Sequence, residues 1–256
     1  MDPKYPTAEH EAAAHAAVDF FAGKPETQAV LLTCSCAREK ASRDSCLDIT
    51  VLVLPGTDQA AVKRAWSGFS ETQDVFTAVR QVGEYSHVDL ELTDGCFAPG
   101  YHGWTSGPDN FELEIGNTLA YTVPLWQKGD CLQRLKDQWL PYYNETLRKE
   151  RLAMVVRYCL NNLDHISLFV DRGLYFQAFD RLYHALGEFL QALFISRRTY
   201  PIAYDKWVKE QIVEILGLPK LYPQLPRLLE IRNFESQEIA LRAEDLRRLL
   251  EEYVIE

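Results

Sequence analysis

Apolar residues recur with a period of two in the first half of the chain and with helical spacing in the second half. The clearest period-two segment is 47–54, in which one face is shared by Leu47, Ile49, Val51 and Val53. Asp48 falls on the opposite face. Shorter apolar runs bounded by turn residues give three more expected strands, 29–33, 75–81 and 87–93. The last two are expected to form a hairpin around Gly83.

Helix signals separate and follow these strands. Thr7 and Asp58 are expected to cap two helices of the first half, because their side-chain oxygens can accept from the backbone N–H groups of a first helical turn. From about residue 130 the pattern is helical, with glycine, proline and asparagine between segments. The expected helices there are 146–172, 174–197, 204–216, 221–232 and 236–253. The sequence therefore predicts an α+β fold, with a small mixed-sheet domain at residues 1–128 and an all-α helical bundle at residues 129–256.

Residues 94–110 fit neither pattern. Glycines and prolines in this segment alternate with Phe97, Tyr101, His102 and Trp104. A connection of this length inside a compact domain is usually functional or disordered. The aromatic content favours an ordered lid, although the same loop could equally serve contact between two copies of the chain in a homodimer.

Composition and charge narrow the classes of function. The chain has 256 residues, of which 47% are hydrophobic, and a formal net charge of -10. This charge argues against broad binding to nucleic acid, whose phosphate backbone requires a basic partner, and fits a small-molecule acceptor better, in particular a cationic one. No apolar run approaches the roughly 18 residues that span a bilayer, and the N-terminus lacks the features of a signal peptide. We therefore expect no membrane partner, a cytoplasmic location and reduced cysteines.

One short region carries a more specific motif. The run Leu31-Leu32-Thr33-Cys34-Ser35-Cys36-Ala37-Arg38 leads from an apolar strand into a loop, and Cys46-Leu47-Asp48 begins the next strand. This order of parts resembles the signature of the nucleotidyltransferase superfamily (polymerase-beta-like fold), in which a Gly-Ser pair opens a helix and an Asp-x-Asp pair begins the following strand. The chain departs from that signature at two positions, since Cys34 stands at the glycine and Cys46 at the first aspartate.

The helical second half is similar to the helical half of antibiotic and related small-molecule nucleotidyltransferases. Tyr200-Pro201, followed by Asp205-Lys206-Trp207, resembles a short run that recurs in that group. The resemblance implies transfer of a nucleoside monophosphate from a nucleoside triphosphate to a small hydroxylated acceptor.

The resemblance also implies a magnesium site made by carboxylates on two neighbouring strands. Asp48 matches the second acid of the family's pair and Asp89 matches the third acid, while Glu91 lies on the same strand face as Asp89 and would assist or replace it. Mg²⁺ prefers such hard oxygen ligands. The thiol of Cys46, at the remaining ligand position, is soft and mismatched. The simpler alternative is that these acids mark a strand end and the solvent-facing side of a strand.

The loop before the second strand is expected to bind the triphosphate. Ser35 matches the family's phosphate-binding serine, and the nearby cations Arg38, Lys40 and Arg43 are expected to contact the phosphates. Without the motif, the serine would be interpreted as a helix cap and the three cations as solvated surface charges.

The acceptor side is expected on the helix at 174–197. A narrow polar stripe on this otherwise apolar helix consists of Asp180, His184, Glu188 and Gln191. In family members with this helical half an acid from it can act as general base for the acceptor hydroxyl, so Asp180 and Glu188 are both candidates. The same stripe is also typical of a solvated helix face.

The aromatic loop supplies further candidates for the acceptor. Trp104 or Tyr101 would line the acceptor cleft, and the two acids that follow the loop, Glu112 and Glu114, are alternative candidates for binding a cationic acceptor. The histidines show no spacing typical of metal ligands.

Three hypotheses remain open. The first is a magnesium-dependent nucleotidyltransferase. The second, favoured by Cys46, is a protein of the same fold that has lost its chemistry and senses a nucleotide or a partner. The third is an interaction scaffold without a ligand. The clustering of Cys34, Cys36 and Cys46 also admits a zinc or redox site, but Cys-x-Cys is not a standard zinc spacing and buried thiols are the simpler interpretation.

Overall fold

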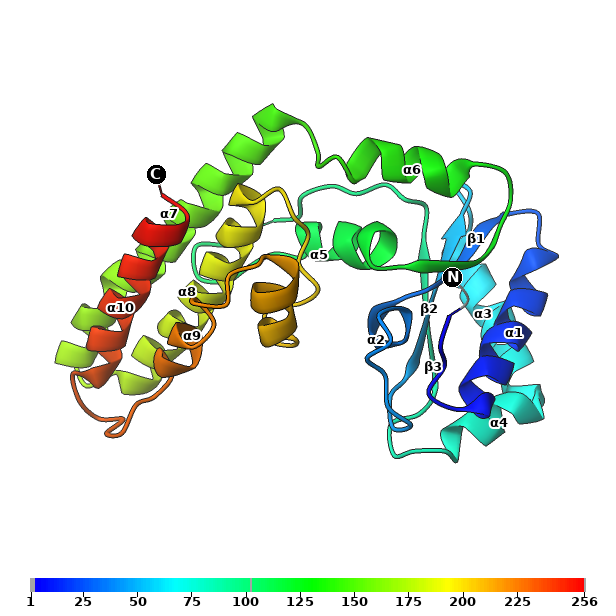
Figure 1. Ribbon diagram of the computed structural model, residues 1–256, viewed down its shortest axis with the longest axis horizontal. Helices are drawn as coiled ribbons and strands as arrows, with labels where there is room; N and C mark the ends of the chain where they lie inside the picture. Colours follow the sequence, from blue (N-terminus) through cyan, green and yellow to red (C-terminus); the bar gives the residue numbers. More distant parts are fainter. Residues whose placement is uncertain (1–2, 102, 256) are drawn as a thin grey trace. The chain divides into compact units, whose positions relative to one another are not determined.

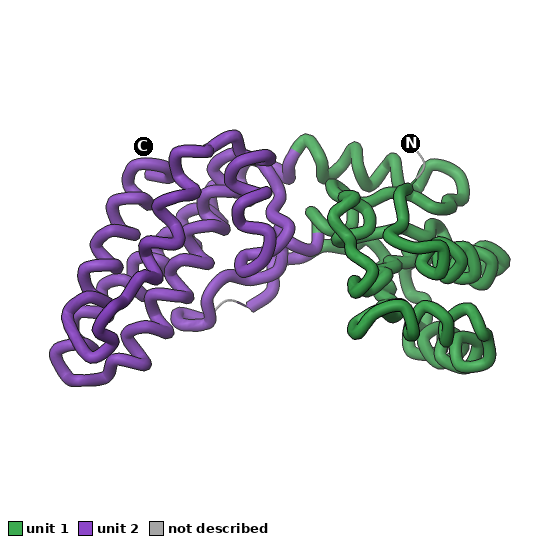
Figure 2. Tube along the Cα trace, turned by 60° about the horizontal axis from the view of Figure 1, so that its bottom comes forward, with its two compact units in different colours: residues 1–97, 115–141 green, residues 98–114, 142–256 purple. Residues whose placement is uncertain are grey.

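The computed structural model describes residues 3–101 and 103–255. The chain divides into two compact units (Figure 2). Unit 1 comprises Met1–Phe97 and Ile115–Pro141, and unit 2 comprises Ala98–Glu114 and Tyr142–Glu256. Each unit has its own hydrophobic core. The fold is α+β, with a mixed sheet in one unit and helices in the other.

Unit 1 is built on a four-stranded sheet with the order β3-β2-β1-β4 (Figure 1). The strands are β1 (Thr27–Leu32), β2 (Leu47–Val53), β3 (Val88–Thr93) and β4 (Val123–Gln127). β1 pairs antiparallel with both β2 and β4, whereas β2 and β3 are parallel. Two neighbouring strands of unit 1 therefore begin at the same end of the sheet.

The helices of unit 1 include α1 (Ala8–Ala22), α2 (Cys34–Ala37), α3 (Gln59–Thr72), α4 (Asp74–Arg80), α6 (Cys131–Trp139) and a π-helical segment, Gly116–Ala120. Trp66 of α3 is at the centre of an aromatic cluster, with Phe21 stacked on it at 5.2 Å and Phe76 edge-on at 5.1 Å between ring centroids. These aromatic contacts join α1, α3 and α4 over the buried side chains of β1 and β2.

Unit 2 is a helical domain. Its long helices α7 (Glu145–Asp171) and α8 (Tyr175–Ser196) pack along each other, and α10 (Glu238–Tyr253) packs against both (Figure 1). A π-helical segment, Glu210–Ile215, and the short helix α9 (Gln224–Arg227) connect α8 to α10. The chain passes between the two units after Phe97, within the short helix α5 (Phe111–Ile115) and after Pro141. No described helix is both long enough and apolar enough to cross a membrane.

Several sequence expectations are confirmed. The Thr7 hydroxyl accepts from the backbone N–H of His10 at the start of α1, and the Asp58 carboxylate accepts from the N–H of Ala61 at the start of α3. β1, β2 and β3 lie within two residues of the expected strands. The segment from Asp94 to Asn110 contains no helix or strand among its described residues.

The expected hairpin was wrong. Residues 75–81 lie mostly in α4 rather than in a strand, because Phe76 and Val79, three residues apart, are buried on one helix face. Asp74 and Arg80 also have the signs that favour the two ends of a helix. Because α3 and α4 lie between β2 and β3, the chain returns to the end at which β2 began and β3 runs parallel to β2.

In the second half, the expected helix 204–216 is only partly helical and ends in the π-helical segment, while 221–232 contains only the short α9. The division into units also differs from the expected boundary at residues 128 and 129. α6 packs on β1 and on the π-helical segment of unit 1, and the loop 98–114 belongs to unit 2.

Candidate active site

The register of β2 and β3 brings the predicted acids together. Asp48 and Asp89 are direct register partners on these parallel strands, and Glu91 is the partner of Thr50. Since partner positions of adjacent strands project from the same face of a sheet, the three carboxylates share one face. Asp48 is half-buried, whereas Asp89 and Glu91 are at exposed positions.

Successive side chains of β2 point to opposite faces of the sheet, and this alternation places Asp48 on the face that it shares with Asp89. Leu47 and Ile49, the neighbours of Asp48, are buried in the core of unit 1. Two backbone bonds hold the start of the strand. The Thr33 N–H donates to the Asp48 carbonyl at 3.0 Å, and the Leu47 N–H donates to the His87 carbonyl at 2.8 Å. The end of β1, the start of β2 and the start of β3 are therefore held together where the acids lie.

Burial and neighbouring negative charge both act on the Glu91 carboxyl. Loss of water around this carboxyl, and then the charge of Asp89, raise the pKa of Glu91, while Lys63 acts in the opposite direction. A cation placed near these carboxylates would relieve the repulsion. The face is therefore suited to a positively charged ligand.

Cys46 differs from a carboxylate in both charge and hydrogen bonding. Its thiol donates to the two carboxylate oxygens of Asp48 at 3.4 and 3.3 Å. Burial, and then the charge of Asp48, raise the pKa of Cys46 to about 12, so the thiol is neutral near pH 7. Cys46 thus supplies a hydrogen bond where the family's signature has a carboxylate.

These residues fit a metal ion only in part. Among the described residues, no group of three or more His, Cys, Asp and Glu side chains could hold a metal ion. Mg²⁺ is commonly held by one or two carboxylates together with the phosphates of its substrate. Asp48 and Asp89 suit that arrangement, whereas a resident ion held by protein ligands alone, zinc included, does not fit.

The loop after β1 contains a strained residue where the family's signature has glycine. Cys34, the first residue of α2, has a φ of 54°. This left-handed conformation is disfavoured for residues with a Cβ. The backbone of this loop therefore has the shape expected for glycine, although the side chain is that of cysteine. Ser35 follows within α2 and is half-buried.

Cys34→Gly is expected to raise the free energy of unfolding of unit 1 by about 1 kcal/mol, because it removes the strain of the left-handed conformation. Cys34→Val is expected to lower it by a similar amount, since a β-branched side chain tolerates this conformation poorly. Urea unfolding of the two variants beside the wild type measures both effects. Equal stabilities for glycine and valine at this position would show that the strain is absent.

The three predicted phosphate contacts have different surroundings. Lys40 and Arg43 are exposed, and Arg38 is half-buried. Burial raises the pKa of Cys34 to about 11, and the charge of Arg38 has a smaller, opposite effect. Arg43 donates from Nε to the Val82 carbonyl at 3.0 Å, which joins the loop before β2 to the turn before β3. Arg43 thus has a structural role in the loop.

A histidine that sequence reasoning did not single out also holds this loop. His10 is buried in α1, with Nε2 at 3.0 Å from both the Ser45 carbonyl and the Ser86 hydroxyl. The Ser86 hydroxyl in turn donates to the Arg43 carbonyl at 2.9 Å. A single histidine on a helix gives no sequence signal of such contacts, which join three distant segments of the chain.

The two predicted general bases lie in unit 2 and differ in accessibility. Asp180 is exposed and lies 3.5 Å from Nδ1 of His184. Glu188 is fully buried, and its carboxylate accepts from Nδ2 of Asn162 at 2.8 Å. Burial raises the pKa of Glu188 to about 8. Of the two, Asp180 has the exposure that a general base for an external hydroxyl requires.

Glu112 is held by an internal network of unit 2. It is fully buried and accepts from Nε of Arg151 and from the Tyr143 hydroxyl, both at 2.6 Å. Arg151 also binds Asp109, at 2.8 Å, and the Gln191 amide donates to Glu112 at 2.8 Å. This network attaches the loop 98–114 to α7 and α8. Its geometry does not favour Glu112 as a binding group for a cationic acceptor.

The remaining acceptor candidates lie in the aromatic loop or directly after it. Tyr101, which is exposed, lines a cavity of about 330 Å³ together with Glu114. Trp104 instead packs on α7, with its ring edge-on to Tyr158 at 4.8 Å and its carbonyl accepting from Asn161. Tyr101 and Glu114 therefore remain next to open space, whereas Trp104 is partly covered by α7.

No family model matches the chain, and no curated protein matches it. Among solved structures it is similar to a nucleotidyltransferase-like protein from Exiguobacterium sibiricum 255-15, with 17% identity and a TM-score of 0.47, over 94% of this chain and 74% of that chain. A similarity of this degree carries no weight for function, which has to be inferred from the geometry of β2 and β3.

Proposed function

We propose that the β2–β3 face binds a nucleoside triphosphate with its divalent cation, and that the protein is a nucleotidyltransferase-like enzyme acting on a small hydroxylated acceptor. The observation that supports this proposal is the direct register pairing of Asp48 with Asp89 on parallel strands. Two hard carboxylates next to each other suit Mg²⁺ that arrives with a triphosphate. Such an ion, when bound, polarises the α-phosphorus and stabilises the leaving pyrophosphate.

The chain's own residues have distinct roles in this proposal. Asp48 and Asp89 hold the cation, and Glu91 lies beside them on the same face. The Ser35 hydroxyl donates a hydrogen bond to a phosphate oxygen, and Arg38 and Lys40 balance the negative charge of the triphosphate. In unit 2, Glu114 with Tyr101 is the proposed contact for a cationic acceptor.

A second candidate function is a nucleotide-binding regulator without catalysis. The observation that favours it is the thiol of Cys46 hydrogen-bonded to Asp48 in place of a further carboxylate. The two functions differ in whether the cation is needed for binding.

Calorimetric titration of each nucleoside triphosphate, with and without Mg²⁺, distinguishes these functions. The enzyme hypothesis predicts binding that requires Mg²⁺ and weakens at least tenfold in Asp48→Asn, because one of two charged ligands is lost. Asp19→Asn, an exposed change on α1, is the matched control and should bind as the wild type does. Cation-independent binding that survives Asp48→Asn would support the regulator, and absence of any binding would contradict both.

Cys46→Asp adds the missing carboxylate and is expected to raise the Mg²⁺-dependent affinity for the triphosphate severalfold. Cys46→Ser, which keeps a neutral hydrogen-bond donor, is the control and should leave that affinity close to the wild-type value. The same titration measures both variants. Unchanged affinity in Cys46→Asp would show that this position does not face the cation.

A further inference from the structure

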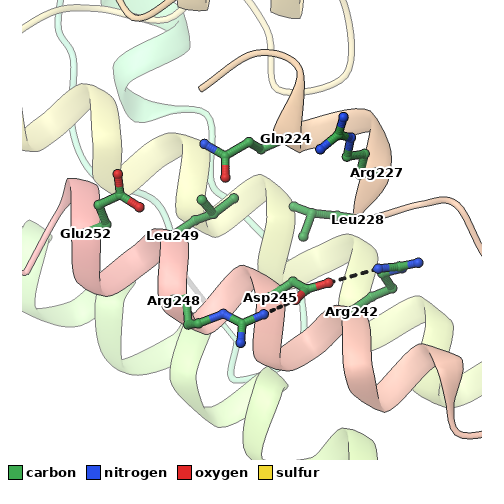
Figure 3. Close-up of a pocket in the computed structure, with 8 residues that line it drawn as sticks. All are labelled: Gln224, Arg227, Leu228, Arg242, Asp245, Arg248, Leu249 and Glu252. Carbon is green, nitrogen blue, oxygen red and sulfur yellow. Dashed lines mark hydrogen bonds and ion pairs between the residues drawn. The ribbon is translucent and has the colours of Figure 1, made fainter. Parts of the chain in front are cut away.

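A second pocket lies in unit 2, between α9 and α10. It has a volume of about 370 Å³, within the lower part of the range found for small-molecule sites. Figure 3 shows two polar rims with an apolar strip between them. Arg227 and Gln224 form one rim, and residues of α10 form the other. None of the residues proposed above for the triphosphate or the acceptor lines this pocket.

The floor of the pocket is apolar. Leu228 and Leu249 lie between the two rims in Figure 3, and only 2% and 5% of their surfaces are exposed. Because these leucines are already buried, the gain for a ligand lying on them would come from its own apolar surface, which would leave water. The pocket therefore suits a molecule with an apolar part of its own.

The lining of the pocket has a small excess of positive charge. The lining contains the three arginines Arg227, Arg242 and Arg248 against two acids, in a chain whose net charge is -10. The local charge thus has the opposite sign to that of the whole chain. Guanidinium groups present several N–H donors in a plane and match the oxygens of phosphate in pairs.

Two of the arginines are already oriented. Asp245 lies between them and accepts from Nη1 of Arg242 at 2.9 Å and from Nη2 of Arg248 (Figure 3). Nε of Arg242 also donates to the Glu230 carbonyl at 3.2 Å. These bonds use only part of the donor capacity of the two side chains, since each guanidinium has five N–H groups.

Arg227 is different. It is exposed at the end of α9, and within the part of the chain that the structure describes its guanidinium has no hydrogen-bond or ion-pair partner. In Figure 3, Arg227 lies on the opposite side of Leu228 from Asp245 and its two arginine partners. An anion between the rims would provide Arg227 with a partner and would use the remaining donors of Arg242 and Arg248.

From this arrangement we propose that the α9–α10 pocket binds a small organic phosphate, with the phosphate between the arginines and its apolar substituent on Leu228 and Leu249. The site is independent of the triphosphate site proposed on β2 and β3. Inorganic phosphate could bind the arginines but has no apolar group to place on the leucines. Binding of an organic phosphate and binding of inorganic phosphate can therefore be distinguished by experiment.

The test is an NMR titration of the full chain with phenyl phosphate and, separately, with inorganic phosphate. We expect phenyl phosphate to bind at least tenfold more tightly, with shift changes in the amides of Gln224, Leu225, Arg227, Leu228 and residues 242–252. Equal affinities would show an ion site without the apolar half and would overturn the proposal as stated. Changes centred on residues outside α9 and α10 would also overturn it.

Variants identify the arginines involved. Arg227→Gln and Arg248→Gln are each expected to weaken phenyl phosphate binding at least fivefold, because each removes charge and donors from one rim. Arg232→Gln, an exposed change outside the pocket lining, is the matched control and should bind as the wild type does. Because the Arg248 side chain is 72% exposed, its replacement should not disturb the fold, which the unperturbed remainder of the NMR spectrum checks. Binding unchanged in both pocket variants would contradict the proposal.

Discussion

Arg151→Ala is expected to lower the free energy of unfolding of unit 2 by about 3–5 kcal/mol, the usual cost of removing one partner from a buried ion pair. Only 3% of the Arg151 side chain is exposed, and 0% of Glu112. Without the guanidinium, Glu112 and Asp109 would remain buried as unneutralised carboxylates. The cost is large because the charges lose their partner, and not because the ion pair itself is strongly stabilising.

Urea and thermal unfolding measure this effect, and a loss of this size corresponds to a melting temperature lower by about 10 °C for a chain of this length. Arg248→Ala, which removes an exposed partner of Asp245, is the matched control and should change stability by less than about 1 kcal/mol. Combining Arg151→Met with Glu112→Gln should recover part of the loss, because one buried charge is then absent. A single variant as stable as the wild type would show that the network is not closed in solution.

Glu188→Gln is expected to remove a pH dependence of stability. Glu188 is fully buried, and burial raises its pKa from 4.5 to about 8, against smaller opposite effects of Asn162 and Arg181. At a pH between these two pKa values, Glu188 keeps its proton in the folded protein but has released it in the unfolded chain. Stability therefore falls as pH rises from about 4.5 to about 8, and changes no further from this group above that range.

Each tenfold difference in proton affinity is worth about 1.4 kcal/mol, so the effect at pH 9 has a ceiling of about 4–5 kcal/mol. Urea unfolding at pH 4, 6 and 9 should show the glutamine variant close to the wild type at pH 4 and more stable at pH 9. Glu251→Gln, at an exposed position of α10, should follow the wild-type curve throughout. Parallel curves for Glu188→Gln and the wild type would contradict the raised pKa.

The parts of the fold that follow from local patterns were predicted well. The helix caps at Thr7 and Asp58 each depend on a side chain and a backbone N–H group three residues apart. β2 was predicted from the alternation of apolar residues within its own sequence. α4 was missed because its short apolar run also fits a strand, and only the burial of Phe76 against Trp66 and Phe69 of α3 decides between them. β3 runs parallel to β2 because α4, together with α3, returns the chain to the end of the sheet at which β2 began.

The features of the site that could not be predicted depend on distant contacts. Glu112 follows the aromatic loop in sequence, and nothing near it indicates that Arg151, on α7, neutralises it. Glu188 and Asp180 lie on one predicted stripe, yet one is buried and the other exposed, because α7 covers only part of α8. By contrast, the pairing of Asp48 with Asp89 was anticipated only through the resemblance to the nucleotidyltransferase signature, since no local pattern sets the register between two strands 41 residues apart in sequence.

In the proposed function, a cation accompanying a triphosphate binds beside Asp48 and Asp89. The most direct test replaces Mg²⁺ with paramagnetic Mn²⁺ and follows the backbone amide signals by NMR in the presence of a non-hydrolysable nucleoside triphosphate. We expect the signals of residues 46–50 and 88–91 to broaden first, and this broadening to be lost in Asp48→Asn. Broadening centred elsewhere, or unchanged in that variant, would contradict this placement of the cation.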